Sequence, residues 1–448
     1  MIHRAAFLAC LFIASLLCGC ARSEFEVDRE ITASRNAAGP PEDRPFWWGV
    51  STSSYQTEDA GPAAENLGFK TDWDLACESG FIDHARGQGT WSYSQVERDI
   101  AAMKSIGVTH YRFSVEWARV EPRPGEFNEA AIAHYANVAR TVREAGIEPV
   151  VTLWHFTFPS WLSSESYSRH GWLHPRCAER WGPFVRKMVG ALAPHVETFA
   201  PQNEPNAYAF GVLIQYFPPG GRPSYRRYLR ILDAEAEAFI EAAKIIREIR
   251  ADARVISVQS IIHWKKNLLD VGRFWYRKGL EYNYYHLDRI VEACDWIGIN
   301  YYFREMAWPL SRWSQAMRRG RDVSEAGWYM DADGLAVEIA ALSRRYGKPI
   351  LITENGVPDK TDRTRQRYLM DHVFAVRRAI AQGHDVRGYF HWSLMDNYEW
   401  ASGYEANFGL FAVDPRSRAL VPKESARLFC LFATCGKIVQ DMESIPAR

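Results

Sequence analysis

From residue 46 onward, the chain repeats one pattern: an amphipathic helical stretch, a glycine, and then a short apolar segment. Residues 95–106 place apolar side chains at helical spacing, Gly107 follows, and residues 110–115 have the composition of a buried strand. The same order recurs around Gly146 and Gly347. A glycine directly after a helix favours the left-handed C-cap that stops it. The pattern therefore predicts strands that alternate with helices, as in an α/β fold.

Eight segments qualify as strands in this alternation. They cover residues 47–52, 110–115, 149–155, 198–204, 254–260, 296–302, 349–354 and 387–393. This number of strands predicts a single (β/α)8 TIM barrel, and a doubly wound sheet is the alternative. The barrel is favoured because nearly every apolar segment ends in a polar or aromatic side chain. These residues are Gln56, Arg112, His155, Asn203, Glu204, Tyr302, Glu354 and Trp392, and the fifth segment supplies none that we can identify. At the carboxyl rim of a barrel they would face one pocket.

The charge balance argues against nucleic acid as a partner. Lys+Arg 54 equals Asp+Glu 54, so no summed field draws the chain toward a polyanion or an anionic membrane surface. A neutral substrate fits better. The chain also contains 17 Trp, 21 Tyr and 23 Phe. Most of these rings are expected in the core, but a few beside polar groups would suit a sugar, which presents apolar ring faces and hydroxyl edges.

The N-terminal sequence is typical of a targeting segment. Residues 1–19 combine a weakly basic start with an apolar run that is too short to span a membrane comfortably. Residues 17–20 (LCGC) resemble a bacterial lipobox, which implies cleavage before Cys20, lipidation of Cys20, and a place in the bacterial cell envelope, at the outer membrane or periplasmic face. Ordinary secretion is the alternative. Residues 20–45 are polar and lack periodicity, which predicts a flexible linker before one domain over residues 46–448.

The remaining cysteines do not indicate a metal site. Once Cys10, Cys18 and Cys20 are assigned to the signal and anchor, five of the eight remain, without zinc-site spacing. Cys430 and Cys435 would be able to bridge in an oxidising compartment, but buried free thiols are an equal alternative. We expect no metal or organic cofactor.

Two glutamates stand at the ends of different predicted strands, Glu204 and Glu354, with 354 − 204 = 150 residues between them. They can lie across one pocket only if the barrel closes. Glycoside cleavage requires such a pair, in which one carboxylic acid protonates the leaving oxygen while the other carboxylate attacks the anomeric carbon or activates water. The alternative for either glutamate alone is an ordinary loop charge.

Six motifs in order resemble glycoside hydrolase family 1, the β-glucosidase family, over residues 46 to about 414. They are residues 46–56 (FWWGVSTSSYQ), 111–114 (YRFS), 203–205 (NEP), 300–302 (NYY), 352–356 (ITENG) and 392–400 (WSLMDNYEW). The resemblance implies that Glu354 is the nucleophile and Glu204 the acid, then base. Arg112 and Tyr302 would keep Glu354 ionised, and the pKa of Glu204 would be raised by facing that charge.

The resemblance also implies the sugar-binding residues. Gln56, His155, Asn203, Glu399 and Trp400 would hold the hydroxyls of the cleaved sugar, Trp392 would lie under its ring, and Trp328 would form a platform for the leaving group. Core packing is the alternative for each aromatic residue. Phe156 departs from the family, because many members carry Trp after the histidine. Phenylalanine has no indole N–H, so one hydrogen bond near the 3-hydroxyl is in doubt.

The leading hypothesis is a retaining β-glycosidase that hydrolyses O-linked β-D-glucosides or related unphosphorylated β-glycosides. Its partners would be small-molecule or oligosaccharide β-glycosides, with the membrane contacted only through the lipid anchor. The Glu399 carboxylate would repel a phosphorylated sugar. A catalytically idle glycan-binding lipoprotein and a transglycosylase are the alternatives, although a binding protein has no need of both glutamates.

Overall fold

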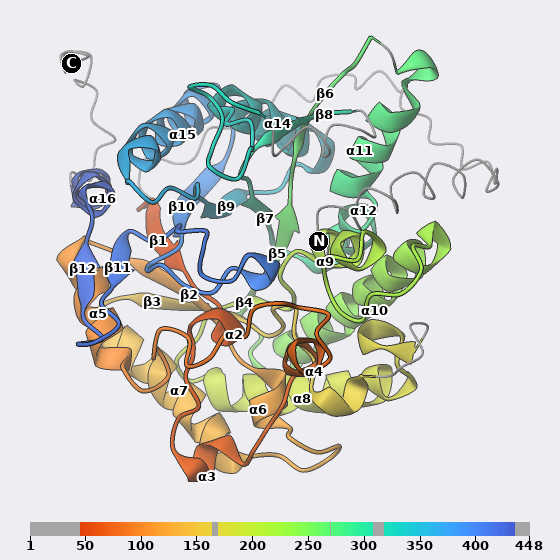
Figure 1. Cartoon of the computed structure of the whole chain (residues 1–448), viewed down its shortest axis with the longest axis vertical. Helices are drawn as coiled ribbons and strands as arrows, with labels where there is room; N and C mark the ends of the chain where they lie inside the picture. Colours follow the sequence, from red (N-terminus) through yellow and green to blue (C-terminus); the bar gives the residue numbers. More distant parts are fainter. Residues whose placement is uncertain (1–44, 164–168, 269, 308–317, 435–448) are drawn as a thin grey trace.

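The computed structural model describes residues 45–163, 169–268, 270–307 and 318–434. Eight parallel strands close a barrel in the order β1-β10-β9-β7-β5-β4-β3-β2. The strands are β1 Trp47–Ser51, β2 His110–Ser114, β3 Glu148–Thr152, β4 Thr198–Ala200, β5 Arg254–Ser260, β7 Trp296–Asn300, β9 Ile350–Asn355 and β10 Val386–Trp392. Since β1 pairs with both β10 and β2, no edge remains open. The predicted (β/α)8 barrel is therefore confirmed and the doubly wound sheet is excluded (Figure 1).

Helices surround this barrel, and two small ribbons extend it (Figure 1). The helices are α2 Ser54–Thr57, α3 Ala63–Asn66, α4 Asp72–Glu78, α5 Val96–Ser105, α6 Trp117–Val120, α7 Glu129–Glu144, α8 Pro175–Leu192, α9 Pro205–Leu213, α10 Tyr225–Ile249, α11 Phe274–Tyr284, α12 Leu287–Ile290, α14 Ala332–Tyr346, α15 Arg363–Ala381 and α16 Glu424–Thr434. Short 3₁₀ turns are η1 Ser160–Leu162, η3 Gly171–Leu173, η4 Val271–Arg273, η5 Val291–Ala293 and η7 Trp400–Ser402. The ribbons pair β6 His263–Lys265 with β8 Arg304–Met306 and β11 Phe411–Val413 with β12 Leu420–Pro422.

The fourth strand is shorter than the sequence pattern predicts. We expected residues 198–204, but β4 ends at Ala200. Pro201 has no N–H to donate to the ladder, so the chain leaves the sheet there. The other strands begin and end within two residues of their predicted limits, except that β3 ends at Thr152, three residues before the predicted 155. Gly107, Gly146 and Gly347 have φ of 71°, 83° and 64°, so the predicted left-handed positions are confirmed.

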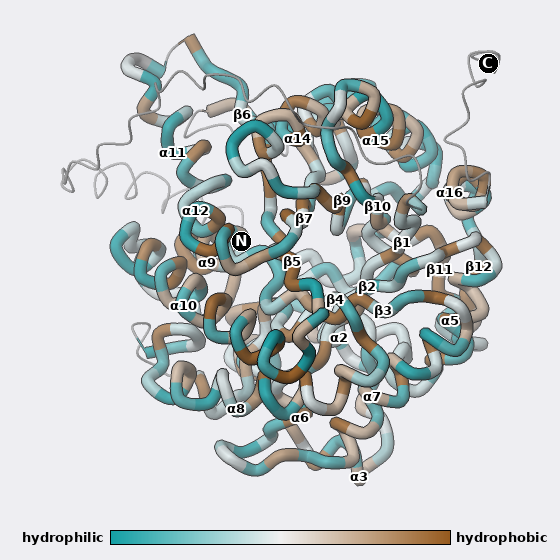
Figure 2. The backbone as a smooth tube through the Cα atoms, turned by 180° about the vertical axis from the view of Figure 1, so that it is seen from behind, coloured by the Kyte–Doolittle hydropathy of each residue, from teal (hydrophilic) through white to brown (hydrophobic). Residues whose placement is uncertain are grey.

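The core has two parts. Inside the barrel, a small cluster of Val150, Ala200, Ile256, Val258, Leu351 and Phe390 fills the lumen. A larger cluster lies between the strands and the apolar faces of the surrounding helices, whose backbones alternate between hydrophobic and hydrophilic residues in Figure 2. The filled lumen leaves the carboxyl rim as the place for a site.

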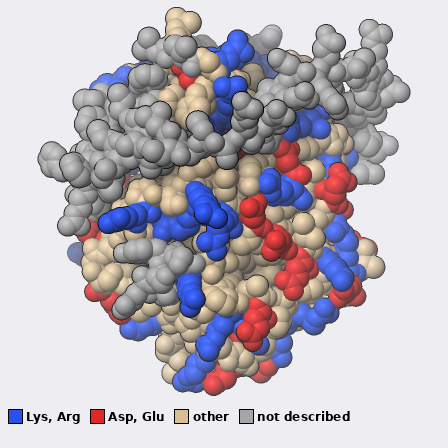
Figure 3. Space-filling view, turned by 90° about the vertical axis from the view of Figure 1, so that its right-hand side faces the viewer, with Lys and Arg blue, Asp and Glu red and all other residues tan. Residues whose placement is uncertain are grey.

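The surface shows no large field of one sign on the face seen in Figure 3, where basic and acidic side chains are interspersed. Over the described part of the chain, no helix is both long and apolar enough to cross a membrane. Cys20 and the predicted signal and linker, up to residue 44, lie outside the described residues. Cys430 is a free thiol in the structure, and its proposed partner Cys435 is also outside the described residues.

Gly298 on β7 provides a test of barrel packing. A Cβ at this position would meet the carbonyl oxygen of Ser257 at 2.1 Å and the Thr353 side chain at 2.8 Å. We expect Gly298→Ala to lower the free energy of unfolding by roughly 1 to 3 kcal/mol, because the neighbouring strand cannot move away cheaply. Gly190 on α8 has nothing within 4 Å of an added Cβ, so Gly190→Ala is the matched control and should be neutral or stabilising. Thermal unfolding of the two variants tests this prediction. Equal melting temperatures would contradict the packing argument.

Candidate active site

Glu204 and Glu354 both lie at the carboxyl rim, and Asn300 links them. Glu204 follows β4 and Glu354 is in β9, while Asn300 ends β7. Asn300 Nδ2 donates to Glu204 Oε1 at 2.8 Å, and its hydrogen bond also lowers the pKa of Glu354. Both carboxyl groups are almost fully buried. Barrel closure thus brings two carboxyls from distant parts of the chain to one amide.

Local backbone geometry points Glu204 into the barrel mouth. Its φ is 41°, in the left-handed region that a non-glycine residue seldom adopts, and Pro205 begins α9 directly after it. The Glu204 N–H donates to the Val258 carbonyl at 2.9 Å, and its own carbonyl accepts from the Tyr208 N–H at 3.0 Å. Backbone strain of this kind persists only where surrounding contacts fix it, and it clusters at functional sites.

Arg112 is the only charged partner that hydrogen-bonds either carboxyl group among the described residues. It is 1% exposed, and Nη1 donates to Glu354 Oε1 at 2.5 Å. Nη2 donates to Asn203 Oδ1 at 2.6 Å, and Nε donates to Thr152 Oγ1 at 2.9 Å. Tyr302 Oη donates to the other oxygen of Glu354, Oε2, at 2.5 Å. Glu354 therefore has a cation and a phenol, whereas Glu204 has one neutral amide donor.

The two carboxyls differ in how firmly they hold a proton. Burial raises the pKa of Glu204, and the charge of Glu354 raises it further, to about 8. Burial also raises the pKa of Glu354, but Arg112 and the hydrogen bond from Tyr302 lower it. Because those groups favour the charged form, Glu354 ionises first and the shared proton resides on Glu204.

His155 and Asn203 form a second polar edge of the pocket. Asn203 Nδ2 lies 3.1 Å from His155 Nε2, and burial, with the nearby charge of Arg112, lowers the pKa of His155 well below its usual value. The neutral ring therefore accepts at Nε2 and carries its proton on Nδ1. Nδ1 is buried without a hydrogen-bond partner in the described structure, so a donor is available for a ligand.

Glu399, Trp392 and Gln56 form a further group of site residues, and the Trp392 ring lies 5.9 Å from the His155 ring. Trp392 Nε1 donates to Glu399 Oε1 at 3.0 Å. Burial raises the pKa of Glu399 well above its usual value. Gln56 uses Nε2 for Asn397 Oδ1 and the Tyr398 carbonyl, and its Oε1 accepts from Ser53. Its remaining capacity toward a ligand is thus as an acceptor.

Aromatic side chains complete the walls. Trp400 is buried and stacks on Tyr55, with ring centroids 5.8 Å apart and planes 9° apart. Trp328 stacks on Phe303 at 5.0 Å and lies 5.9 Å from Tyr302. All the site residues expected from the sequence therefore come from the carboxyl rim and its loops.

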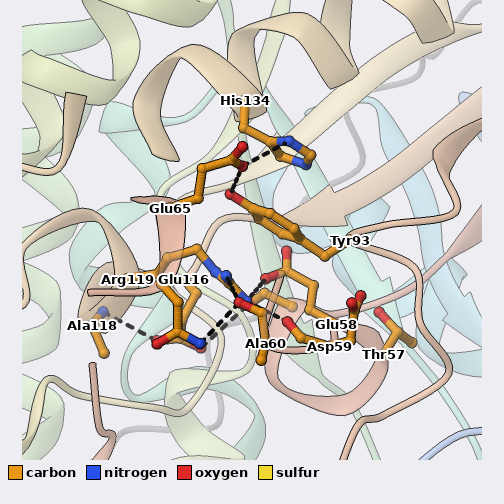
Figure 4. Close-up of polar contacts among 12 residues, drawn as sticks. Thr57, Glu58, Asp59, Ala60, Glu65, Tyr93, Glu116, Ala118, Arg119 and His134 are labelled. Carbon is orange, nitrogen blue, oxygen red and sulfur yellow. Dashed lines mark hydrogen bonds and ion pairs between the residues drawn. The ribbon is translucent and has the colours of Figure 1, made fainter. Parts of the chain in front are cut away.

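A buried ion-pair network fixes the loops behind the pocket (Figure 4). The Arg119 guanidinium lies 3.3 Å from Glu58 Oε2 and donates to the backbone carbonyls of residues 59–60. Glu116 caps α6 and accepts from Thr157 Oγ1 at 2.9 Å, while burial raises its pKa to about 7. Contacts among segments after β1, β2 and β3 hold the loops that carry the sugar-facing edge.

Sequence reasoning missed the roles of Asn300 and Thr152. Asn300 belongs to the motif at residues 300–302, but only Tyr302 was assigned a role from it. Its position as the last residue of an apolar strand was the available signal. Thr152 is a hydroxyl on a buried strand, and nothing in its neighbours distinguishes a hydrogen bond to Arg112 from ordinary strand packing.

Comparison with known proteins identifies the class. The family model of glycosyl hydrolase family 1 matches residues 41–268 and 278–437. The bifunctional β-D-glucosidase/β-D-fucosidase of Bifidobacterium breve is 31% identical over 444 residues, which cover 85% of this chain and 95% of that protein. The solved β-glycosidase from Pyrococcus horikoshii shares 29% identity with a TM-score of 0.77, over 89% of this chain and 96% of that one. This chain belongs to glycosyl hydrolase family 1, and it is an enzyme of the β-glycosidase class.

One relative is named for transfer rather than for hydrolysis. The chloroplastic galactolipid galactosyltransferase of Arabidopsis thaliana is 29% identical over 377 residues, which cover 79% of this chain and 59% of that protein. The relatives of this chain thus include a protein named for transfer as well as proteins named for hydrolysis.

Tyr302→Phe tests the electrostatic asymmetry of the pair. Loss of the phenol donor should raise the pKa of Glu354, because one hydrogen bond to its charged form disappears. The readout is a ¹³C titration of glutamate carboxyl carbons, with Glu354→Gln used to assign the resonance. Tyr301→Phe is the matched control, since Tyr301 Oη donates to the Asp331 carbonyl instead. An unchanged Glu354 titration in Tyr302→Phe would show that the phenol does not stabilise the carboxylate.

Proposed function

We propose that this enzyme is a retaining β-glycosidase that hydrolyses unphosphorylated β-glycosides, such as O-linked β-D-glucosides, through a covalent glycosyl-enzyme. The observation that carries the proposal is the unequal pair: Glu354 has a cation at 2.5 Å, while burial and the charge of Glu354 raise the pKa of Glu204 to about 8. The cation favours the charged form of one carboxyl, while the other holds its proton more firmly, as double displacement requires.

The reaction runs in two balanced steps. In the first, a Glu354 oxygen attacks the anomeric carbon, the glycosidic bond breaks, and Glu204 gives its proton to the departing oxygen. In the second, Glu204, now a carboxylate, takes a proton from water as that water attacks the anomeric carbon, and Glu354 leaves with its charge restored. Arg112 and Tyr302 stabilise Glu354 as a leaving group.

The rest of the pocket is assigned to the sugar. Asn203 has one N–H left after its bond to His155, and it would reach the 2-hydroxyl. His155 Nδ1 would donate to a further hydroxyl, and Gln56 and Glu399 would bind adjacent hydroxyls. Trp392 would lie under the ring, Trp400 beside it, and Trp328 against the leaving group.

The expected preference for an unphosphorylated sugar rests on Glu399 and the acidic groups around it. Burial raises the pKa of Glu399 well above its usual value. The charged groups that act most strongly on Glu399 are both acidic, Glu354 and Asp396. A phosphate there would face two carboxylates whose neighbouring cations, Arg112 and Lys423, are already paired with them.

Transfer to an alcohol is the second candidate, favoured by the relative named as a galactosyltransferase. Transfer and hydrolysis share the glycosyl-enzyme and differ only in the acceptor. Product analysis in the presence of methanol separates them, because a transglycosylase would give mainly the methyl glycoside. Since the chain is a glycosidase with both glutamates in the pocket, we do not favour an idle glycan-binding protein.

The stereochemical test is ¹H NMR of the first-formed anomer from a nitrophenyl β-glucoside. Retention predicts the β-anomer at first, and carboxyl groups roughly 5 to 5.5 Å apart. Initial appearance of the α-anomer would show inversion and overturn the covalent mechanism.

Substitution of each glutamate should give different leaving-group dependence. Glu354→Ala removes the nucleophile, so hydrolysis should collapse for every aglycone. Glu204→Ala removes proton donation, so an alkyl glycoside should lose about 10²- to 10⁴-fold in rate, whereas a nitrophenyl glycoside should still give a burst as the glycosyl-enzyme accumulates. Glu292→Ala, at an exposed glutamate of η5, is the control. Equal losses on both substrates in both folded catalytic variants would refute this division of roles.

We also propose that Cys20 is the lipidated N-terminus of the mature enzyme in the bacterial envelope, on the basis of the LCGC motif at residues 17–20. Membrane fractionation of Cys20→Ala should move the enzyme out of the detergent-requiring fraction. Cys18→Ala leaves the lipidated position intact and serves as the control. A wild-type enzyme that is already soluble without detergent would contradict the anchor.

A further inference from the structure

One exposed surface beside the pocket combines apolar and basic side chains. We call it the rim patch, and it consists of Lys265, Lys266, Leu268, Arg273, Phe274, Arg277 and Met306. Leu268 is 101% exposed, Phe274 39% and Met306 36%. Large apolar side chains this exposed, with basic residues beside them in the sequence, are the feature that needs an explanation.

The rim patch adjoins the wall assigned to the leaving group. Ribbon β6–β8 continues from the carboxyl ends of β5 and β7, and Lys265 pairs with Met306 across it. Residues 302–303 directly precede Arg304 at the start of β8, and the Tyr302 and Phe303 rings contact Trp328. The loop between β6 and α11 projects from the body at the top of Figures 1 and 2.

The positive charge of the rim patch is not neutralised by carboxylates of the protein itself. Lys265, Lys266, Arg273 and Arg277 form no ion pair with any carboxylate in the described part of the chain. Asp270 is the only acidic residue between positions 263 and 280. It is buried and accepts the backbone N–H groups of residues 275–276, so it does not face the basic side chains outside.

This combination matches the boundary of an anionic bilayer. Basic side chains are attracted to anionic headgroups, while leucine, phenylalanine and methionine side chains enter the acyl boundary beneath them. Trp275 beside Phe274 adds an interfacial aromatic ring, with centroids 5.0 Å apart. A soluble polyanion would be served by the cations alone and would leave Leu268 in water.

We propose that the rim patch binds the surface of an anionic phospholipid bilayer and so presents the pocket to β-glycosides whose aglycone is embedded in the membrane. The presentation of membrane-embedded β-glycosides rests on the proposed function, whereas the binding of the rim patch to the bilayer does not. This contact is separate from the lipid anchor at Cys20, and it gives the enzyme an orientation that a tether alone would not impose.

Vesicle binding tests the contact directly. The barrel is complete between residues 45 and 434, so the chain from residue 21 onward, which lacks the anchor, is sedimented with phosphatidylcholine vesicles with or without about one third phosphatidylglycerol. We expect binding only with phosphatidylglycerol, weakened by salt. Lys265→Gln with Lys266→Gln should weaken it roughly fivefold per cation, and Leu268→Ser with Phe274→Ser should weaken it comparably.

The matched control replaces the same kinds of side chain, one apolar and one basic, on another face of the protein. Ile240→Ser with Lys244→Gln, on α10, replaces an apolar side chain that is 45% exposed and an exposed lysine, and it should bind like the wild type. Equal sedimentation of the wild type with neutral and anionic vesicles would overturn the proposal. So would unchanged binding of Leu268→Ser with Phe274→Ser, together with equally tight binding of soluble heparin, because the patch would then be a polyanion site.

Turnover separates this proposal from the catalytic one. Rim-patch variants should hydrolyse a soluble nitrophenyl β-glucoside at the wild-type rate, which also shows that they are folded. On dodecyl β-D-glucoside in anionic vesicles they should lose at least about tenfold in rate, in line with the binding loss. If the wild type cleaves neither glucoside, the proposed function fails while the sedimentation result stands. Equal turnover of the membrane glucoside by variants and wild type would refute presentation by the patch.

Discussion

The ion pair between Arg112 and Glu354 is the constraint on which the site depends. A buried guanidinium is tolerable only if its donors are used, and Arg112 uses them on Glu354, Asn203 and Thr152. These partners come from three regions of the barrel, so the same side chain fixes the nucleophile candidate, orients the amide beside Glu204 and ties the rim together. Loss of one partner would leave a buried charge uncompensated, which is why such pairs are costly to break.

The fold could be predicted because its signals are local and repeated. Apolar strands, amphipathic helices and stop glycines each occur within a short window, and closure follows from their number. The prediction failed at residues 201–204, where strand-like composition hid a proline that ends the ladder before Glu204. The helix that begins at Pro205 then sets the unusual backbone of Glu204, and no pattern of apolar residues encodes that angle.

The site was predictable in its residues but less so in their states. Side chains at strand ends meet because the barrel closes, so their proximity follows from topology. The raised pKa of Glu399 follows instead from burial by segments distant in sequence, and the occupied donors of Gln56 follow from residues 397–398. Such long-range contacts leave no trace near the residue they affect. The linking role of Asn300 was missed for the same reason.

The Nδ1 atom of His155, which has no hydrogen-bond partner in the described structure, has a consequence for the choice of sugar. A buried donor without a partner is unfavourable, and a ligand that supplies an acceptor there relieves the penalty, whereas a ligand that lacks one leaves it in place. Sites built in this way reject the analogue that lacks a hydroxyl far more strongly than apolar pockets reject a missing methylene. The enzyme would therefore discriminate sharply against a sugar deoxygenated at the position facing His155, and would tolerate changes at positions where its polar atoms are already satisfied by the protein.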